Sequence, residues 1–355
     1  MRVAYPRVEV SLPADAGPHA QALPIDAWYA VAHDREVGAS PRSVRILGQS
    51  AVLFRSGGEL AALRDRCPHR HAPLSDGVVH PDGLACPYHG WRFAPDGRCV
   101  AMPGLVDGSP DAPSRRADPL PVRVQDGLIW LSVGEPPADP PRLPLVGQSA
   151  VHTLRWRFDV RADPVDALEN FLDPTHTHTV HPGLVRTEGS RRRVPVTVRG
   201  LPGGVEAVYQ EEAQSGLIAR WFGADIRESY GRYLWPGLAQ LGYRDAEGTE
   251  KLVISASFVP ASTPGEPPEV DLVAVVSGRP PRWIPGVVMG ALLAPFLKRT
   301  VAQDKAILER VAPLRDPERR YAMSPLDLLR PHIDRLLADP ERLTPSTPRS
   351  TRLDL

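Results

Sequence analysis

Cysteine is scarce in this sequence, whose 355 residues include three: Cys67, Cys86 and Cys99. So few cysteines argue against a small secreted fold held together by disulfides, and they suggest that those present have a chemical task. The chain also lacks net charge, since 42 Lys and Arg residues balance 42 Asp and Glu residues. That balance argues against a nucleic acid or an anionic membrane as the main partner.

Long apolar runs are missing as well. The most apolar segment, 283–297, is shorter than the ~20 residues that span a bilayer, and it contains Pro285 and Pro295. We therefore expect a packed helix there and no membrane span. The first 25 residues lack the pattern of a secretory signal, in which a basic start is followed by an apolar stretch. We therefore expect no secretory signal and a cytoplasmic protein.

The length predicts two domains, because 355 residues exceed the usual size of one hydrophobic core. Short apolar or alternating runs between turn signals predict a small antiparallel β domain in the first half. Prolines then cluster in the segment EPPADPPRLP, which is typical of a linker. The predicted division is an N-terminal extension at 1–25, a first domain at 26–135, a linker at 136–150, a second domain at 151–340 and a flexible tail at 341–355.

The second domain is expected to be α+β. Residues 152–160 form a predicted strand and residues 164–180 a predicted helical segment. Longer alternating runs then predict an antiparallel sheet, and two helices are expected after it, at 287–311 and 325–337. The alternating runs lie at 194–198, 205–209, 230–235, 252–258 and 270–276.

Two loops in the first half carry a specific set of donors: Cys67 and His69, then, after sixteen residues, Cys86 and His89. Two thiolates and two imidazoles match a Rieske [2Fe–2S] cluster, in which cysteines hold one iron and histidines the other. The alternative is zinc, which also takes two Cys and two His. Zinc fingers, however, place these ligands on a hairpin and a helix, whereas here Cys and His alternate across two loops rich in Gly and Pro.

The remaining cysteine and a nearby histidine have simpler interpretations. His71 does not complete the C-x-H spacing, so we expect it to lie behind the ligands or in solvent. Cys99 has no partner left, and a small packed side chain is the expectation for it.

The loop sequences CPHRHAPLSDG and CPYHGWRFAPDGRC resemble the Rieske loops of aromatic-ring-hydroxylating and demethylating oxygenases. The resemblance extends to WYAVAHDREV at the start, to ENFLD and to a downstream QD helix, and it is closest to vanillate demethylases and pheophorbide a oxygenase-like enzymes. It implies an antiparallel β Rieske domain carrying the [2Fe–2S] cluster. It also implies a following α+β catalytic domain of helix-grip type, with an antiparallel sheet covered by helices and a mononuclear Fe(II).

In that family the pattern D-x2-H-x4-H supplies two histidines to the mononuclear iron, and Asp173, His176 and His181 match it. Five residues correspond to about 140° around a regular helix, so both histidines can face one metal only if the helix ends between them. Pro182 and Gly183 provide that ending at His181. A weaker alternative pairs His178 with His181, and three incidental histidines near a helix end are another.

A non-haem iron that activates O2 usually takes two histidines and a carboxylate. Leu297, Val301, Leu308 and Val311 recur at helical spacing, and Asp304 falls on the same apolar stripe. A buried carboxylate requires a metal or a strong partner, and the segment resembles the family's carboxylate helix. Asp304 is therefore the expected third ligand, with a capped or salt-bridged helix residue as the alternative.

The resemblance gives Asp173 a role between the two centres. In related oxygenases the corresponding aspartate bonds a mononuclear-iron histidine and a Rieske histidine of the neighbouring subunit, which implies a head-to-tail homotrimer. Asp173 also precedes Pro174, so a local role as a helix N-cap is a second expectation. Both roles are compatible.

By resemblance, the chain is expected to be a monooxygenase or demethylase that oxidises a small organic substrate, aromatic or polycyclic, with O2 as co-substrate. It lacks a G-x-G-x-x-G motif, and its cysteines are too few for a further four-cysteine cluster. Electrons from NAD(P)H should therefore arrive indirectly, through a separate reductase and, as a further candidate, a ferredoxin. The alternatives are a cis-dihydroxylating dioxygenase, a desaturase outcome at the same iron, a Rieske electron-transfer protein and a binding module with structural zinc.

Overall fold

The computed structural model describes residues 23–182, 191–210, 226–263, 265–279, 286–316, 321–339 and 348–355. The chain forms two compact units. Within the described residues, the first contains Pro24–Arg142 with Val259–Glu266, and the second contains Leu143–Phe258 with Pro267–Leu355. Ala138 and Pro140, inside the predicted linker, accept hydrogen bonds from the side chains of Trp28 and Gln125, which attaches that part of the segment to the first unit.

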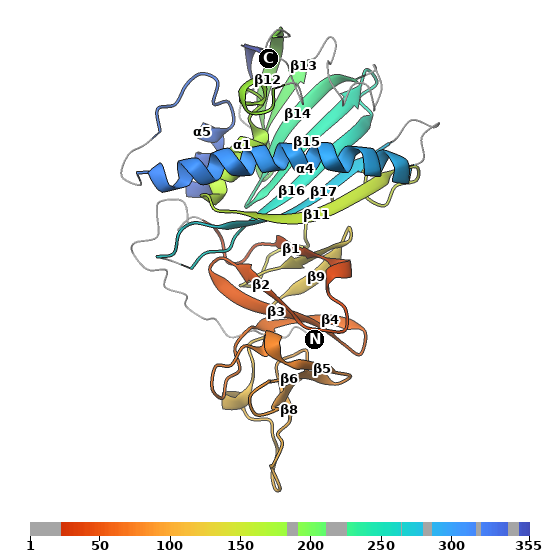
Figure 1. Cartoon of the computed structure of the whole chain (residues 1–355), viewed down its shortest axis with the longest axis vertical. Helices are drawn as coiled ribbons and strands as arrows, with labels where there is room; N and C mark the ends of the chain where they lie inside the picture. Colours follow the sequence, from red (N-terminus) through yellow and green to blue (C-terminus); the bar gives the residue numbers. More distant parts are fainter. Residues whose placement is uncertain are drawn as a thin grey trace. The chain divides into compact units, whose positions relative to one another are not determined.

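The first unit consists of three small antiparallel sheets, drawn in red to yellow in Figure 1. Short 3₁₀ turns connect the strands at Asp34–Glu36, Leu74–Asp76 and Pro113–Arg115. The first sheet has β1 (Tyr29–His33), β10 (Leu128–Leu131) and β9 (Val122–Gln125), and the second has β2 (Arg42–Ile46), β3 (Gln49–Ser56) and β4 (Glu59–Arg64). The third has β5 (Val78–His80), β6 (Gly83–Ala85), β7 (Arg92–Phe93) and β8 (Cys99–Ala101).

The core of this unit includes all three cysteines, packed with Phe54, Leu63 and other apolar residues. Cys99 is 1% exposed, and its Sγ atom contacts the carbonyl oxygen of Ala101. The prediction that Cys99 is a small packed residue is therefore confirmed.

The second unit is built on one eight-stranded sheet, in the order β11-β17-β16-β15-β14-β13-β12-β18. β11 pairs with β17 in antiparallel register, and β12 to β16 pair antiparallel with their sequence neighbours. The strands are β11 (His152–Val160), β12 (Arg193–Leu201), β13 (Gly204–Gln210), β14 (Ile226–Leu234), β15 (Leu238–Asp245), β16 (Glu250–Pro260), β17 (Val270–Gly278) and β18 (Arg349–Asp354).

Helices cover one face of this sheet: α1 (Pro164–Leu172), α2 (Thr177–Val180), α4 (Gly286–Val311) and α5 (Arg330–Ala338), with a 3₁₀ turn at Ala312–Leu314. Figure 1 shows the long α4 running across the strands. Leu293 of α4 packs on Leu252 of β16, and Phe171 of α1 lies edge-on to Phe258 of the same strand. Because residues two apart on a strand share a face, α1 and α4 cover the same side of the sheet.

The α+β prediction is confirmed, but the helix expected at 164–180 is interrupted. Asp163 caps α1 by accepting hydrogen bonds from the amides of Val165 and Asp166. The helix ends at Leu172 because the next residue precedes a proline, which disfavours the α conformation. Asp173 accordingly has an extended backbone, with φ −77° and ψ 117°.

The C-terminal part corrects two other predictions. The helix expected at 325–337 begins at Arg330, because Ser324 and Asp327 close a hydrogen-bonded turn before it. The tail expected to be flexible at 341–355 includes β18, which pairs with β12, and its Leu353 and Leu355 are buried. The polar composition of this segment concealed an edge strand, since alternate side chains there face solvent.

Within the described residues, no helix is both long and apolar enough to cross a membrane.

Candidate metal centres

The two loops that carry the C-x-H and C-x2-H motifs share one hydrogen-bond pattern. In the first, the Cys67 amide donates to Ala72 O at 2.9 Å and the His71 amide donates to Cys67 O at 2.9 Å. In the second, the Cys86 amide donates to Trp91 O at 2.8 Å and the Gly90 amide donates to Cys86 O at 3.0 Å. Each cysteine therefore opens an equivalent tight loop that holds its own histidine.

His71 has a backbone role in this pattern. Its φ is 59°, in the left-handed region, and the equivalent Gly90 has a φ of 69°. The His71 side chain is exposed to solvent. Of the two positions expected for it, behind the ligands or in solvent, the second is confirmed. The amino acid best suited to such a turn is glycine, which the second loop uses.

The cysteine and histidine side chains of these loops differ in how deeply they are buried. Cys67 and Cys86 are 1% and 3% exposed, whereas His89 is exposed and His69 half-buried. Burial raises the pKa of the Cys67 thiol to about 11, and the neighbouring Cys86 thiol adds to the rise. Two buried thiols become thiolates only when a cation is bound there, as in metal sites.

The imidazoles of this site are arranged side by side. The ring centroids of His69 and His89 are 4.6 Å apart, and the indole of Trp91 stacks on His69 at 4.5 Å with an interplanar angle of 2°. Among the described residues, the buried His69 Nδ1 has no hydrogen-bond partner. A buried nitrogen without a partner, next to two buried thiols, fits a site that holds an iron–sulfur cluster.

The second candidate centre begins where α1 ends. The Asp173 carboxylate accepts hydrogen bonds from the amides of Thr175 (2.7 Å) and His176 (3.3 Å). It thereby turns the chain toward the single helical turn of α2. The N-cap of α2 is His176 and Asp173 is the C-cap of α1, so the expected N-cap position of Asp173 is wrong, although its carboxylate does bond the amides that precede α2. His181 is the C-cap of α2, with φ −118° and ψ 50°, so the prediction that the helix ends at this histidine is confirmed.

His176, His181 and Asp304 come together, with ligand atoms that all lie within 4.8 Å of one another. Asp304 Oδ1 lies 3.3 Å from His176 Nε2 and 2.9 Å from His181 Nε2. Asp304 reaches this place from α4, more than a hundred residues later in the chain. His178 is buried but does not belong to the set.

The donors of this set fit a divalent cation. Asp304 Oδ1 is buried and, within the described part of the chain, accepts no hydrogen bond of normal geometry despite its two close nitrogens. Two histidines and one carboxylate on one side are the ligands that non-haem iron oxygenases use. The three residues therefore fit a mononuclear iron.

The charges around this set favour a cation as well. Burial would lower the pKa of His176, but the Asp173 and Asp304 carboxylates raise it to about 9. Burial would likewise raise the pKa of Asp304, but His176 and His181 lower it below its ordinary value. The negative charge of the two carboxylates favours a proton on His176, and the same negative charge favours a bound metal cation.

One residue of this site, Gln303 of the QD pair, was given no role in the sequence analysis. Gln303 Oε1 lies 3.0 Å from Nδ1 of His181, the nitrogen that faces away from Asp304. Only its position next to Asp304 on the same helix could have drawn attention to it.

Comparisons with known proteins agree with both halves of the chain. Residues 27–114 match the Rieske [2Fe-2S] domain, and residues 160–338 match the vanillate O-demethylase oxygenase C-terminal domain. The chain is 33% identical over 213 residues to the oxygenase component of chloroacetanilide N-alkylformylase from Rhizorhabdus wittichii, covering 56% of this chain and 58% of that protein. It is 34% identical over 205 residues to the oxygenase component of dicamba O-demethylase from Stenotrophomonas maltophilia, covering 54% of this chain and 60% of that protein.

The matched stretches therefore span less than two thirds of these curated relatives. A crystal structure of dicamba monooxygenase bound to 3,6-dichlorosalicylic acid is similar over 90% of this chain and 97% of that one, with a TM-score of 0.75 and 24% identity. At that identity the structural likeness shows the fold.

Proposed function

Because this chain belongs to the Rieske oxygenase family, with a Rieske [2Fe–2S] domain and a vanillate demethylase-type catalytic domain, we propose that it is the oxygenase component of a multi-component system. Its reaction is the hydroxylation or oxidative demethylation of an organic substrate with O2. The observation that supports this most directly is the convergence of His176, His181 and Asp304. An electron carrier with a Rieske cluster alone would not need this second set.

The two metal groups are assigned to separate residues. Cys67, His69, Cys86 and His89 hold the [2Fe–2S] cluster, and His176, His181 and Asp304 hold the mononuclear iron. When bound there, the cluster would provide one-electron chemistry and the iron would provide a site for O2 activation next to the substrate. The exposed His89 and the buried cysteines make the histidine side of the cluster the side accessible to a redox partner.

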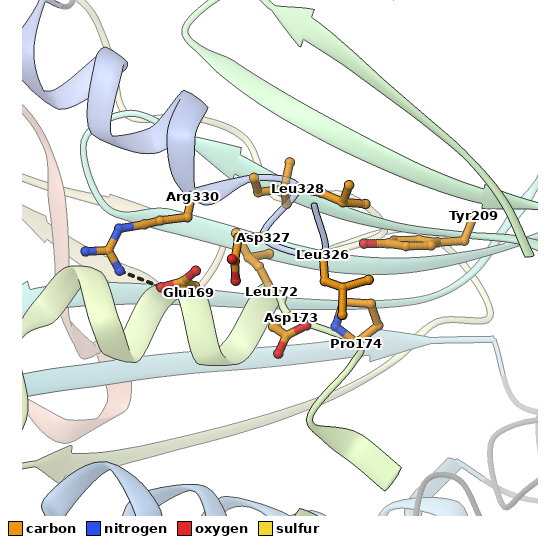
Figure 2. Close-up of a pocket in the computed structure, with 10 residues that line it drawn as sticks. Glu169, Leu172, Asp173, Pro174, Tyr209, Leu326, Asp327, Leu328 and Arg330 are labelled. Atoms are coloured by element: carbon orange, nitrogen blue, oxygen red, sulfur yellow. Dashed lines mark hydrogen bonds and ion pairs between the residues drawn. The ribbon is translucent and has the colours of Figure 1, made fainter. Parts of the chain in front are cut away.

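Asp173 is proposed to link the two centres. Its Oδ2 atom lies 3.5 Å from His176 Nδ1, on the side of that ring away from Asp304. A carboxylate at this nitrogen holds the ring in place and keeps Nε2 directed at the metal. Asp173 also lines a pocket of the same unit, which Figure 2 shows.

The pocket beside Asp173 supports an assembly of several subunits. Its lining includes the carboxylates of Asp173 and Asp327 together with the Glu169–Arg330 ion pair, and a carboxylate such as that of Asp173 suits a positively polarised imidazole N–H. We assign this place to a Rieske histidine of a neighbouring copy, in a head-to-tail homotrimer. Electrons would then pass from one subunit's cluster to the next subunit's iron.

The substrate is proposed to be largely apolar. Leu297 lies two helical turns before Asp304 on α4, and residues seven apart share one helix face. Around it are half-buried apolar side chains on the covered face of the sheet, including Leu154, Trp156 and Tyr243. These side chains pack together, so a substrate bound beside Asp304 on this side would meet apolar neighbours, which favour a small aromatic or polycyclic compound over a charged one.

The electron source is proposed to be a separate reductase, acting alone or through a ferredoxin, so that NAD(P)H acts indirectly. The chain's three cysteines leave none for a second iron–sulfur cluster once Cys67 and Cys86 are used. Two relatives are themselves called oxygenase components, in keeping with such a division of labour.

Product analysis with isotopically labelled O2 tests this function. The chemically reduced holoprotein is mixed with ¹⁸O2 and a panel of O-methyl and N-methyl aromatic compounds. A hydroxylating monooxygenase gives a product with one labelled oxygen atom, and a demethylase gives an unlabelled demethylated product with the label in the formaldehyde that is released and trapped at once. Two labelled atoms in one product identify the alternative, a cis-dihydroxylating dioxygenase. An electron carrier reoxidises without oxidising any compound, and its reoxidation is the same in an Asp304→Ala variant.

A further inference from the structure

The imidazole of His181 is held at both nitrogens by consecutive residues of α4. Gln303 Oε1 lies 3.0 Å from Nδ1, and Asp304 Oδ1 lies 2.9 Å from Nε2. The ring is 1% exposed, so water does not compete for either nitrogen. One turn of one helix therefore fixes the position of this ring from two sides.

This geometry determines which nitrogen is free to bind a metal. A neutral imidazole has one N–H donor and one lone pair. The carbonyl oxygen of Gln303 accepts only from Nδ1–H, so the lone pair is left on Nε2, facing Asp304 and His176. We propose that Gln303 is a positioning residue of the metal centre, which holds His181 in the Nε2-ligating tautomer. This inference rests on the proposed mononuclear iron site and assigns a residue outside its three ligands.

The two histidines of the site are supported by different chemistry. His176 Nδ1 faces the Asp173 carboxylate at 3.5 Å, whereas His181 Nδ1 faces the neutral amide of Gln303. A neutral partner orients the ring without adding a third negative charge beside Asp173 and Asp304. His181 is thus fixed within its own unit, while Asp173 remains available for a second partner.

A purely structural role for Gln303, in fastening α2 to α4, predicts a different outcome from a positioning role. A structural contact contributes to the free energy of unfolding of the metal-free protein. A positioning contact contributes mainly to metal affinity, and partners of metal-bound histidines typically change that affinity by about 10-fold to 100-fold when they are removed.

Three variants separate these roles. Gln303→Leu removes the acceptor, whereas Gln303→Glu retains an acceptor for Nδ1–H. Lys305→Met is the matched control, because Lys305 lies two residues away on α4 and donates to the carbonyl and carboxylate of Asp159, outside the metal set.

The affinity for Co²⁺ is measured anaerobically by competition with a chromophoric chelator, on protein that retains its Rieske cluster, and urea unfolding of the same cobalt-free preparations is measured in parallel. We expect Gln303→Leu to bind Co²⁺ about 10-fold to 100-fold more weakly, with Gln303→Glu and Lys305→Met close to the parent. Unchanged affinity in Gln303→Leu, or equal losses in Gln303→Leu and Gln303→Glu, would overturn the proposal. A parent protein that binds no Co²⁺ would contradict the iron site itself.

Discussion

The guanidinium of Arg330 on α5 bonds the carboxylate of Glu169 on α1, four residues before Asp173 (Figure 2). Arg330 is 3% exposed and also bonds Asp166 and Asp334. Burial would raise the pKa of Glu169, and although Arg330 opposes this, the pKa stays above its ordinary value. The ion pair therefore joins two helices next to the segment that supplies Asp173 and His176.

Replacing Arg330 is expected to destabilise the second unit strongly. Arg330→Met leaves Glu169 without its buried counter-charge and Asp166 with Arg315 alone, and breaking a buried pair costs about 3–5 kcal/mol. Urea unfolding measures the loss. The control is Arg335→Met on the same helix, where the side chain is exposed and a change within about 0.5 kcal/mol is expected. Equal effects of the two substitutions would mean that the buried network contributes little.

Acid is expected to weaken the sheet through Glu206, which is fully buried between Arg199 and Arg232. Burial would raise the pKa of Glu206, but the two arginines lower it more, so the net pKa lies below its ordinary value. The ionised carboxylate therefore stabilises the fold above the unfolded pKa of about 4.3, and this contribution is lost as the pH falls through the lower folded value.

Comparing the wild type with Glu206→Gln by urea unfolding between neutral pH and pH 3 tests this. The stability advantage of the wild type should be greatest at neutral pH and should shrink in acid. An advantage that stays constant over the whole range would contradict the assignment.

Asp173→Asn is expected to keep both metal groups but to slow electron transfer between them, because the amide can no longer hold two N–H donors as a carboxylate does. Stopped-flow reoxidation of the reduced cluster by O2 reports that step. Asp159→Asn on β11 removes a carboxylate charge from an exposed residue that pairs with Lys305 and is outside the pocket lining, and it serves as the control. If both variants reoxidise at the wild-type rate, Asp173 does not link the centres.

Trp91 is expected to hold His69 in its place at the cluster, since the two rings are stacked. Trp91→Leu removes the flat surface and should lower the acid-labile sulfide content and alter the Rieske electron paramagnetic resonance signal. Trp91→Phe retains an aromatic face and should preserve both. Normal sulfide and an unchanged signal in the leucine variant would show that stacking is dispensable.

Sequence patterns were sufficient for features that depend on neighbouring residues. Pro182 and Gly183 indicated the helix end at His181, and the apolar stripe placed Asp304 on the covered face of its helix. The break at Asp173 was readable from Pro174 in the same way, although a longer helix had been expected. Local spacing also identified the two loops whose hydrogen bonds proved equivalent.

Features that depend on distant residues could not be read in this way. The contact of Gln303 with His181 joins segments 122 residues apart, and glutamine on a helix carries no pattern of its own. The pairing of β18 with β12 was likewise hidden by its polar composition.

A chain that carries both a Rieske cluster and a separate iron held by Asp304 must lose only the second metal when that carboxylate is removed. Iron and acid-labile sulfide per chain are measured in anaerobically purified wild type and Asp304→Ala, with electron paramagnetic resonance of the reduced proteins. We expect about three irons and two sulfides in the wild type, and about two irons with an unchanged Rieske signal in the variant. Zinc without sulfide, or equal iron content in the two proteins after ferrous iron is added, would contradict this expectation.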